Sequence, residues 1–172
     1  MAVHRLNHAV LYVRDAEKSA DFYSDLLGFR RLPVGFPGAI FMQAEGSTND
    51  HDLGLFSIGA EAGPSPAGRS AVGLYHLAWE VDTLADLERI AERLTAAGAL
   101  VGATDHGSTK ALYGKDPDGL EFEVSWLVPA HALGVDTAMT SRRLDLPAEI
   151  ARYGGDTAGG VGVSRPGPVT TP

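Results

Sequence analysis

Leu6-Asn-His-Ala-Val-Leu-Tyr-Val13 and Leu74-Tyr-His-Leu-Ala-Trp-Glu-Val81 are two similar stretches that decide the fold of this chain. Corresponding positions, such as His8 and His76, lie a constant 68 residues apart. Similarity at a fixed offset is typical of a repeated supersecondary unit. We therefore expect two copies of one unit, each beginning with a strand that carries a histidine.

A helix is predicted after each of these strands. Apolar residues recur every three or four positions over residues 15–27 and 83–97, the spacing of an amphipathic helix. Asp15 and Thr83 are N-cap residue types. Gly28 and Gly98 follow the last turns, where glycine adopts the left-handed conformation that ends a helix.

Three short extended segments follow each predicted helix, so each copy has the order strand, helix, strand, strand, strand. The predicted segments are residues 29–32, 39–44, 51–58, 100–104, 110–115 and 120–127. The fold class is therefore α+β, with two βαβββ modules at about residues 5–58 and 73–127.

A single domain is expected over residues 1–153, with a Pro/Gly-rich linker at 59–72 and a C-terminal extension at 128–153. Within the extension, residues 147–153 favour a short helix. The Gly/Pro/Thr/Ser-rich residues 154–172 have little to bury, so we expect a disordered tail.

Composition excludes several classes of protein. The 172 residues carry 22 Asp+Glu against 14 Lys+Arg, a formal net charge of -8, and no cysteine. An acidic chain is a poor partner for nucleic acid or an anionic membrane, and without cysteine any metal must be bound by nitrogen and oxygen. The N-terminus lacks the layout of a signal peptide, so we expect a soluble cytoplasmic protein.

Strand alternation predicts which polar residues share a face. His8 and His76 occupy the same position in the two copies, and Glu123 lies opposite the apolar face of the last strand. Glu123 lies 47 residues after His76. The residue 47 positions after His8 is Leu55, so only the second copy has a carboxylate at this position. Two imidazoles and one carboxylate match the facial triad of non-haem Fe(II).

In its paired modules and these three residues, the sequence resembles the vicinal oxygen chelate (glyoxalase, bleomycin resistance, extradiol dioxygenase) superfamily, which builds metal cavities from paired βαβββ modules. The most specific match is Tyr113-Gly-Lys-Asp-Pro-Asp-Gly-Leu-Glu-Phe-Glu123, a strand, an Asp-Pro-x-Gly turn and a strand ending in the ligand Glu. The resemblance implies one concave, metal-containing mixed sheet with the helices outside.

Within the superfamily the sequence is most similar to two-module type I extradiol ring-cleaving dioxygenases. That resemblance implies Fe(II), or Mn(II), which accepts the same ligands, held by His8, His76 and Glu123. It also implies that His51 is an acid/base beside the oxygen site, and that His106 and Tyr113 contact the substrate oxygens.

The function implied is extradiol (meta) cleavage of a catechol-type aromatic diol by O2, in a homo-oligomer that is a dimer or larger. Two alternatives share the fold. A glyoxalase-like lyase or isomerase normally takes a carboxylate from each half, and Leu55 in the first half is unfavourable for it. A metal-free drug-binding resistance protein has no need of the triad. His4 and His131 have no evident partner and are expected at the surface.

Overall fold

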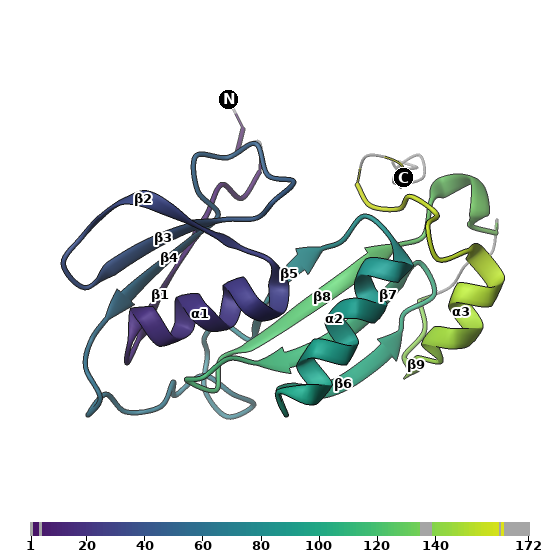
Figure 1. Cartoon of the computed structure of the whole chain (residues 1–172). Coiled ribbons are helices and arrows are strands. Elements are labelled where there is room, and N and C mark those ends of the chain that lie inside the picture. Colours follow the sequence, from purple (N-terminus) through teal and green to yellow (C-terminus); the bar gives the residue numbers. More distant parts are fainter. Residues whose placement is uncertain (1, 4, 135–138, 162, 164–172) are drawn as a thin grey trace. The chain divides into compact units, whose positions relative to one another are not determined.

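The computed structural model describes residues 2–3, 5–134, 139–161 and 163, which fall into two compact units. Unit 1 comprises Met1–Pro66 and Asp116–Leu120, and unit 2 comprises Ala67–Lys115 and Glu121–Pro172 (Figure 1). Each unit contains one of the two repeated stretches, so each is described by itself.

Unit 1 has the predicted βαβββ order. Its elements are β1 (Ala9–Val13), α1 (Ala16–Leu27), β2 (Arg30–Phe36), β3 (Ala39–Gln43) and β4 (Leu53–Ser57). They form a four-stranded sheet in the order β1-β4-β3-β2, with β1 and β4 parallel and the other pairs antiparallel.

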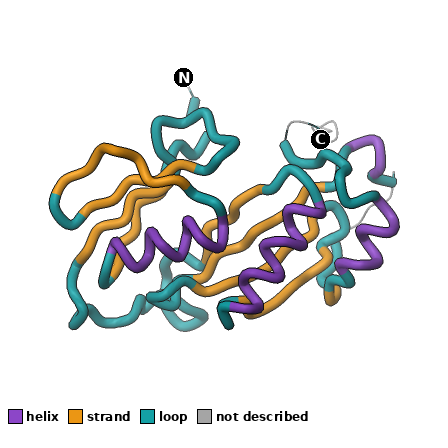
Figure 2. Tube along the Cα trace, viewed as in Figure 1, coloured by secondary structure: helices purple, strands orange, loops and turns teal. Residues whose placement is uncertain are grey.

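Unit 2 repeats this order and extends it (Figure 2). Its elements are β5 (His76–Glu80), α2 (Leu84–Ala96), β6 (Leu100–Asp105), β7 (Thr109–Lys115), β8 (Glu121–Leu127), η1 (Ala130–Ala132), β9 (Arg142–Arg143) and α3 (Leu146–Tyr153). The sheet order is β5-β8-β7-β6-β9, with β5 and β8 parallel. Two mixed sheets and three α-helices confirm the predicted α+β class and its two modules.

The helix ends follow the predicted chemistry. The side chain of Asp15 accepts hydrogen bonds from the backbone N–H groups of Glu17 and Lys18, and that of Thr83 accepts from Asp86 N–H. Gly28 and Gly98 have φ of 78° and 66°, so both adopt the left-handed conformation expected after a helix.

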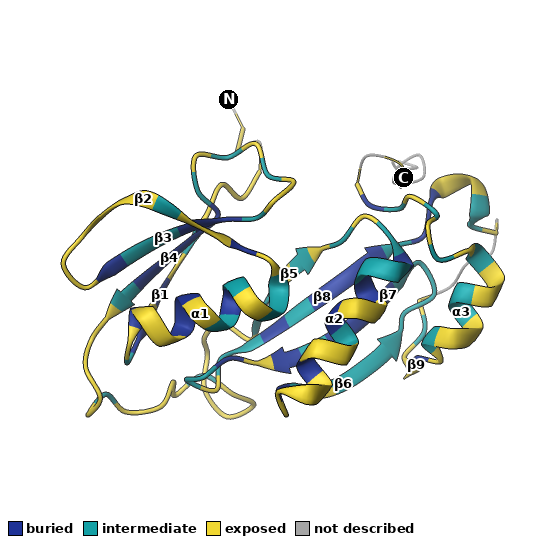
Figure 3. Ribbon diagram, viewed as in Figure 1, coloured by how far each residue is buried: buried dark blue, intermediate teal, exposed yellow. Residues whose placement is uncertain are grey.

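Each core lies between one helix and one face of its sheet. In unit 2, Leu87 and Leu94 of α2 are fully buried, as are Phe122, Val124 and Trp126 on one face of β8. On the other face of β8, Glu121 and Glu123 are half-buried and Ser125 is buried. Figure 3 shows buried and half-buried positions along β8. The prediction that this apolar set forms a core is confirmed.

Several boundaries differ from the prediction. The first strand begins at Ala9 rather than Leu6, and β2 continues to Phe36 past a register irregularity between Arg31 and Gly35. The two-residue β9, which pairs with the edge of β6, has no signal in the sequence. The helix expected in the extension is present as α3.

The start of the predicted tail is hydrogen-bonded where it is described. Gly155 O accepts from Ala85 N–H, Thr157 O accepts from the Trp126 indole, and Val161 N–H donates to Glu80. The other residues of the predicted tail, 162 and 164–172, lie outside the described part of the chain. The domain boundaries stay predictions. Among the described residues, no helix has the length and apolar character needed to span a membrane.

A buried lysine ties the extension to the sheet of unit 2. Lys110 of β7 is 1% exposed, and its Nζ lies 2.5 Å from Asp105 Oδ1 and 3.0 Å from Glu149 Oε2 of α3. Burial raises the pKa of Asp105, but hydrogen bonds from Lys110 and from Gly107 N–H outweigh it, so this pKa is lowered from 3.8. The cation thus offsets two carboxylates that would otherwise repel each other.

We predict that Lys110→Met lowers the free energy of unfolding at pH 7 by about 2 kcal/mol. A fully buried broken pair costs ~3–5 kcal/mol, and here the carboxylates retain some solvent contact. A lowered pKa stabilises the fold above pH 3.8 and this stabilisation is lost as the pH falls through the folded value, so the difference from wild type shrinks below pH 3.8. Urea unfolding at several pH values measures both effects.

Lys115→Met in the same strand is the matched control, because Lys115 is half exposed and its ion pair with Glu121 spans 3.6 Å. Its cost should stay within about 0.5 kcal/mol. Equal costs for the two variants would contradict a special contribution from the buried lysine.

Candidate metal centre

His76 and Glu123 meet across the parallel strands β5 and β8 of unit 2. His76 Nε2 lies 3.3 Å from Glu123 Oε2, although the two residues are 47 positions apart. In the parallel register Ala78 pairs with Glu123, so His76 and Glu123 project from the same face of the sheet. The ladder therefore places an imidazole nitrogen beside a carboxylate.

Tyr113 and His106 continue this cluster across the same sheet. Tyr113 on β7 pairs with Glu123 on β8, so the phenol and the carboxylate lie on the same face of the sheet. Tyr113 OH also lies 2.9 Å from His106 Nε2. Burial, followed by the charge and the hydrogen bond of Glu123, raises the pKa of Tyr113 to about 12. The phenol consequently remains a hydrogen-bond donor at neutral pH.

The tautomer of His106 follows from its second contact. Nδ1 of His106 lies 2.9 Å from the carbonyl oxygen of Thr140, which can only accept. Nδ1 therefore carries a hydrogen, and the Nε2 of a neutral imidazole accepts from Tyr113 OH. The unit 2 cluster thus consists of the hydrogen-bonded pair His106 and Tyr113, with Glu123 beside Tyr113 on the same face and His76 Nε2 3.3 Å from Glu123 Oε2.

His8 and His51, the two site residues predicted in the first half, come together in unit 1. Their ring centroids lie 4.2 Å apart, and the ring of Phe41 contacts His51 at 5.1 Å. His8 Nδ1 lies 2.7 Å from Asn7 Oδ1, an acceptor, so Nδ1 carries the hydrogen and Nε2 keeps its lone pair. His51 Nδ1 lies 3.2 Å from Asp50 Oδ2 in the same way.

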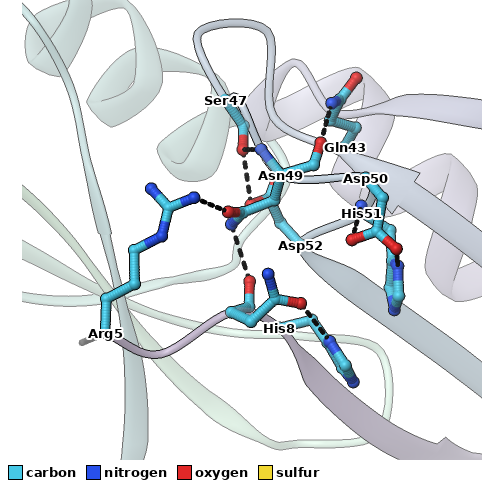
Figure 4. Close-up of polar contacts among 9 residues, drawn as sticks. Arg5, His8, Gln43, Ser47, Asn49, Asp50, His51 and Asp52 are labelled. Atoms are coloured by element: carbon cyan, nitrogen blue, oxygen red, sulfur yellow. Dashed lines mark hydrogen bonds and ion pairs between the residues drawn. The ribbon is translucent and has the colours of Figure 1, made fainter. Parts of the chain in front are cut away.

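A hydrogen-bonded loop places both rings (Figure 4). The carboxylate of Asp52 accepts from Ala44 N–H at 2.9 Å and from the side chains of Ser47 and Asn49 at 2.7 Å. Asn49 also donates to the carbonyl oxygen of Asn7 at 2.7 Å. This network therefore fixes the backbone immediately before His8 and immediately after His51.

The register corrects one step of the sequence argument. Val10 pairs with Gly54 in unit 1, whereas Ala78, the equivalent of Val10, pairs with Glu123 in unit 2. The counterpart of Glu123 is therefore Gly54, and the assignment to Leu55 was wrong by one residue. Leu55 faces the core and is fully buried. Gly54 provides no carboxylate either, so the first half still lacks an acidic residue at this position.

The prediction that strand alternation places His51 in the cavity was also wrong in its reasoning, because His51 lies before strand β4. His51 has the parity of Leu55, which faces the core, yet the ring of His51 lies against that of His8. Strand β4 begins only at Leu53, so pleat alternation does not apply to His51. The loop places His51 beside His8 instead.

The residues present suit a divalent metal bound by nitrogen and oxygen. The buried Nδ1 of His76 has no hydrogen-bond partner, and its Nε2 faces the Glu123 carboxylate. His8 has the second-contact pattern common among metal-binding histidines, in which the other ring nitrogen donates to an amide or carboxylate oxygen. Among the described residues, no group of three or more His, Asp or Glu side chains is arranged to hold a metal ion.

Three of the contacts were not predicted from the sequence. Asn7 and Thr140 set the tautomers of His8 and His106, and the Tyr75 ring lies 4.5 Å from that of His76. Of these three contacts, that of Asn7 has a signal in the sequence, because an asparagine stands directly before the candidate ligand His8. His131 is exposed as expected, and His4 lies outside the described residues.

Comparison with protein families identifies the group to which the chain belongs. Residues 5–124 match the Glyoxalase/Bleomycin resistance protein/Dioxygenase superfamily. The chain belongs to this superfamily. A solved domain of the superfamily from Frankia sp. EAN1pec aligns over 77% of this chain and 98% of its own, with a TM-score of 0.63 and 23% identity, a likeness of fold.

Curated relatives from the superfamily carry more than one activity. A catechol-2,3-dioxygenase of Bacillus subtilis is 34% identical over 69% of this chain, and a manganese-dependent 2,3-dihydroxybiphenyl 1,2-dioxygenase of Geobacillus genomosp. 3 is 30% identical over 71%. The chain spans 40% and 36% of their lengths. A lactoylglutathione lyase of Neisseria meningitidis is 29% identical over 69% of this chain and 88% of its own.

We predict that His76→Ala and Glu123→Ala each weaken binding of Mn(II) or Fe(II) by more than about 100-fold, since changes to groups outside the ligand set alone cost about 10–100-fold. Equilibrium dialysis with metal analysis measures the affinity. Glu121→Gln is the control, because Glu121 lies on the same strand and face but pairs with Lys115. Equal weakening in the control would contradict the assignment of ligands.

Asn7→Ala tests the contact that fixes His8. Loss of the amide acceptor should populate both tautomers of the His8 ring and reduce metal affinity by about 10–100-fold. Long-range ¹H–¹⁵N spectra of the metal-free protein report which ring nitrogen is protonated. An unchanged tautomer in Asn7→Ala would show that this contact does not orient the ring.

Proposed function

We propose that the chain is an extradiol ring-cleaving dioxygenase that inserts O2 into an aromatic vicinal diol at a non-haem divalent metal. The observation that carries this proposal is the unit 2 cluster, in which Tyr113 is hydrogen-bonded to His106 and lies beside Glu123, and His76 lies 3.3 Å from Glu123. Acid/base groups beside a candidate ligand pair are what a chelated diol requires. The similarity to two ring-cleaving dioxygenases supports the same activity.

The proposed metal ligands are His8, His76 and Glu123, with Fe(II) or Mn(II) as the ion. When bound, the metal would lower the pKa of a coordinated diol and leave open positions for both diol oxygens and O2. Two neutral imidazoles and one carboxylate leave a divalent ion with a net charge of about +1, which a diol monoanion neutralises.

The protein groups of the unit 2 cluster have separate tasks in this proposal. When the diol binds, the Tyr113 hydroxyl, which donates to His106 Nε2 in the structure, turns its hydrogen to a diol oxygen and so frees Nε2. His106 accepts the proton that the diol loses at Nε2, since the Thr140 carbonyl holds the hydrogen on Nδ1.

His51 is proposed as the acid/base of unit 1. Its Nδ1 faces Asp50, so Nε2 remains for exchange of a proton with the oxygen side of the reaction. The ring of Phe41 against His51 limits access of water to the imidazole.

A lyase acting on a glutathione adduct is the second candidate, favoured by the 88% of the Neisseria lactoylglutathione lyase that the chain spans. The register is unfavourable for it. Superfamily lyases are expected to take a carboxylate from each half, and the first-half position is Gly54. A Cβ there would lie 3.3 Å from the Phe41 ring, so a carboxylate side chain would displace that ring.

We predict that protein loaded anaerobically with Fe(II) or Mn(II) consumes O2 and forms a yellow ring-opened product when a catechol and air are added. Glu123→Ala should abolish the product, and His51→Ala should lower kcat by about 10²–10⁴-fold, the usual contribution of a general acid/base. Oxygen-electrode traces and visible spectra measure both.

Glu121→Gln serves again as the control and should retain activity. Formation of lactoylglutathione from methylglyoxal and glutathione, without O2 uptake on any catechol, would favour the lyase and overturn this proposal.

A further inference from the structure

The turn between β6 and β7 of unit 2 carries His106 and is closed by its own hydrogen bonds. His106 N–H donates to the carbonyl oxygen of Thr109 at 2.9 Å, and Gly107 N–H donates to the carboxylate of Asp105 at 2.8 Å. Gly107 has a φ of 83°, a left-handed conformation that glycine adopts without strain. These contacts fix the path of the chain at His106, and the orientation of the imidazole depends on other groups.

Each ring nitrogen of His106 has a hydrogen-bond contact, and the two contacts differ in kind. Nε2 lies 2.9 Å from Tyr113 OH, and Nδ1 lies 2.9 Å from the carbonyl oxygen of Thr140. A phenol hydroxyl can donate or accept, so Tyr113 accommodates His106 with or without a hydrogen on Nε2. A carbonyl oxygen only accepts, so Thr140 is the contact that selects the tautomer with the hydrogen on Nδ1.

The side chain of Thr140 holds this carbonyl against the turn. Its hydroxyl donates to the carbonyl oxygen of Asp105 at 2.9 Å, whereas its N–H donates to the carbonyl oxygen of His106 at 3.3 Å. The hydroxyl makes the shorter of these two bonds. The side chain at position 140 therefore determines how firmly the carbonyl that selects the tautomer is held.

Other parts of the C-terminal extension reach the same turn at Asp105. The buried Lys110 bridges Asp105 Oδ1, at 2.5 Å, and Glu149 Oε2 of α3, at 3.0 Å. The antiparallel pairing of β9 with β6 places Arg142 opposite Asp105. Thr140, Arg142 and Glu149 all follow the second βαβββ module, so residues outside the repeated unit fix the position directly before His106.

Resting on the proposed function, we propose that Thr140 is a positioning residue that holds His106 as a proton acceptor at Nε2. When Tyr113 turns its hydrogen to a bound diol, an Nε2 without hydrogen can take the proton that the diol loses. The O–H bond of the diol then breaks and an Nε2–H bond forms, which gives an imidazolium. With its hydrogen on Nε2 instead, the neutral ring has no lone pair there to accept that proton. Thr140 acts in this step through His106.

The first test needs neither metal nor diol. Long-range ¹H–¹⁵N spectra of the metal-free, full-length protein give the ratio of the two neutral tautomers of His106, assigned by comparison with His106→Gln. We expect the hydrogen on Nδ1 in the wild type. Thr140→Val removes the hydroxyl and should lower the ratio of the Nδ1–H to the Nε2–H form by about 2–10-fold, the scale of one hydrogen bond. Thr140→Ser keeps the hydroxyl and should restore the wild-type ratio.

Thr95→Val is the matched control, because the hydroxyl of Thr95 also donates to a backbone carbonyl oxygen of unit 2, that of Ala91 on α2. It should leave the tautomer ratio of His106 unchanged. Circular dichroism confirms that each variant folds.

The second measurement is turnover of catechol by the protein loaded with Fe(II) or Mn(II). In Thr140→Val, kcat should fall in proportion to the fraction of His106 in the Nδ1–H form, with KM unchanged, and Thr140→Ser should recover it. Absence of O2 uptake by the wild type would overturn the proposed function, and the tautomer ratio would still decide whether Thr140 positions His106. An unchanged ratio in Thr140→Val, or an equal loss in Thr140→Val and Thr140→Ser, would overturn the inference.

Discussion

The parallel pairing of the first and last strands of each module is the constraint on which the rest depends. A helix and two strands separate β5 from β8 in sequence, yet the two strands are neighbours, in register from His76 with Glu121 to Glu80 with Ser125. Parallel pairing requires a long crossover connection, which α2 provides by packing against the sheet. Because paired residues share a face, this arrangement brings His76 to Glu123 and leaves the open face of the sheet for chemistry.

Local patterns were sufficient to predict the elements. The N-caps Asp15 and Thr83, the glycines after each helix and the apolar set on β8 act within a few residues, and the structure confirms them. The repeat at an offset of 68 residues predicted the order of elements in both modules, because two similar stretches begin similar units. Structure that depends on residues a few positions apart can be predicted from the sequence alone.

Register was not predictable in the same way. A slip of one residue moves a side chain to the other face of a sheet. The pairing of Val10 with Gly54 depends on where the loop of Asp52 and Asn49 ends, a property of several hydrogen bonds rather than of alternation. For this reason Leu55, rather than Gly54, was predicted to be the counterpart of Glu123. The strand of the extension, β9, has two residues and pairs with the edge of β6. A strand this short has no local sequence pattern that would predict it.

The role of the C-terminal extension could not be predicted from the sequence. In the structure the extension contacts the candidate site at the end of β6. Thr140 accepts from His106 Nδ1, and its own hydroxyl and N–H donate to the carbonyl oxygens of Asp105 and His106. Since Nδ1 is held as a donor, the Nε2 of His106 must face Tyr113 as an acceptor whenever the ring is neutral. The extension thereby fixes which ring nitrogen His106 presents to Tyr113.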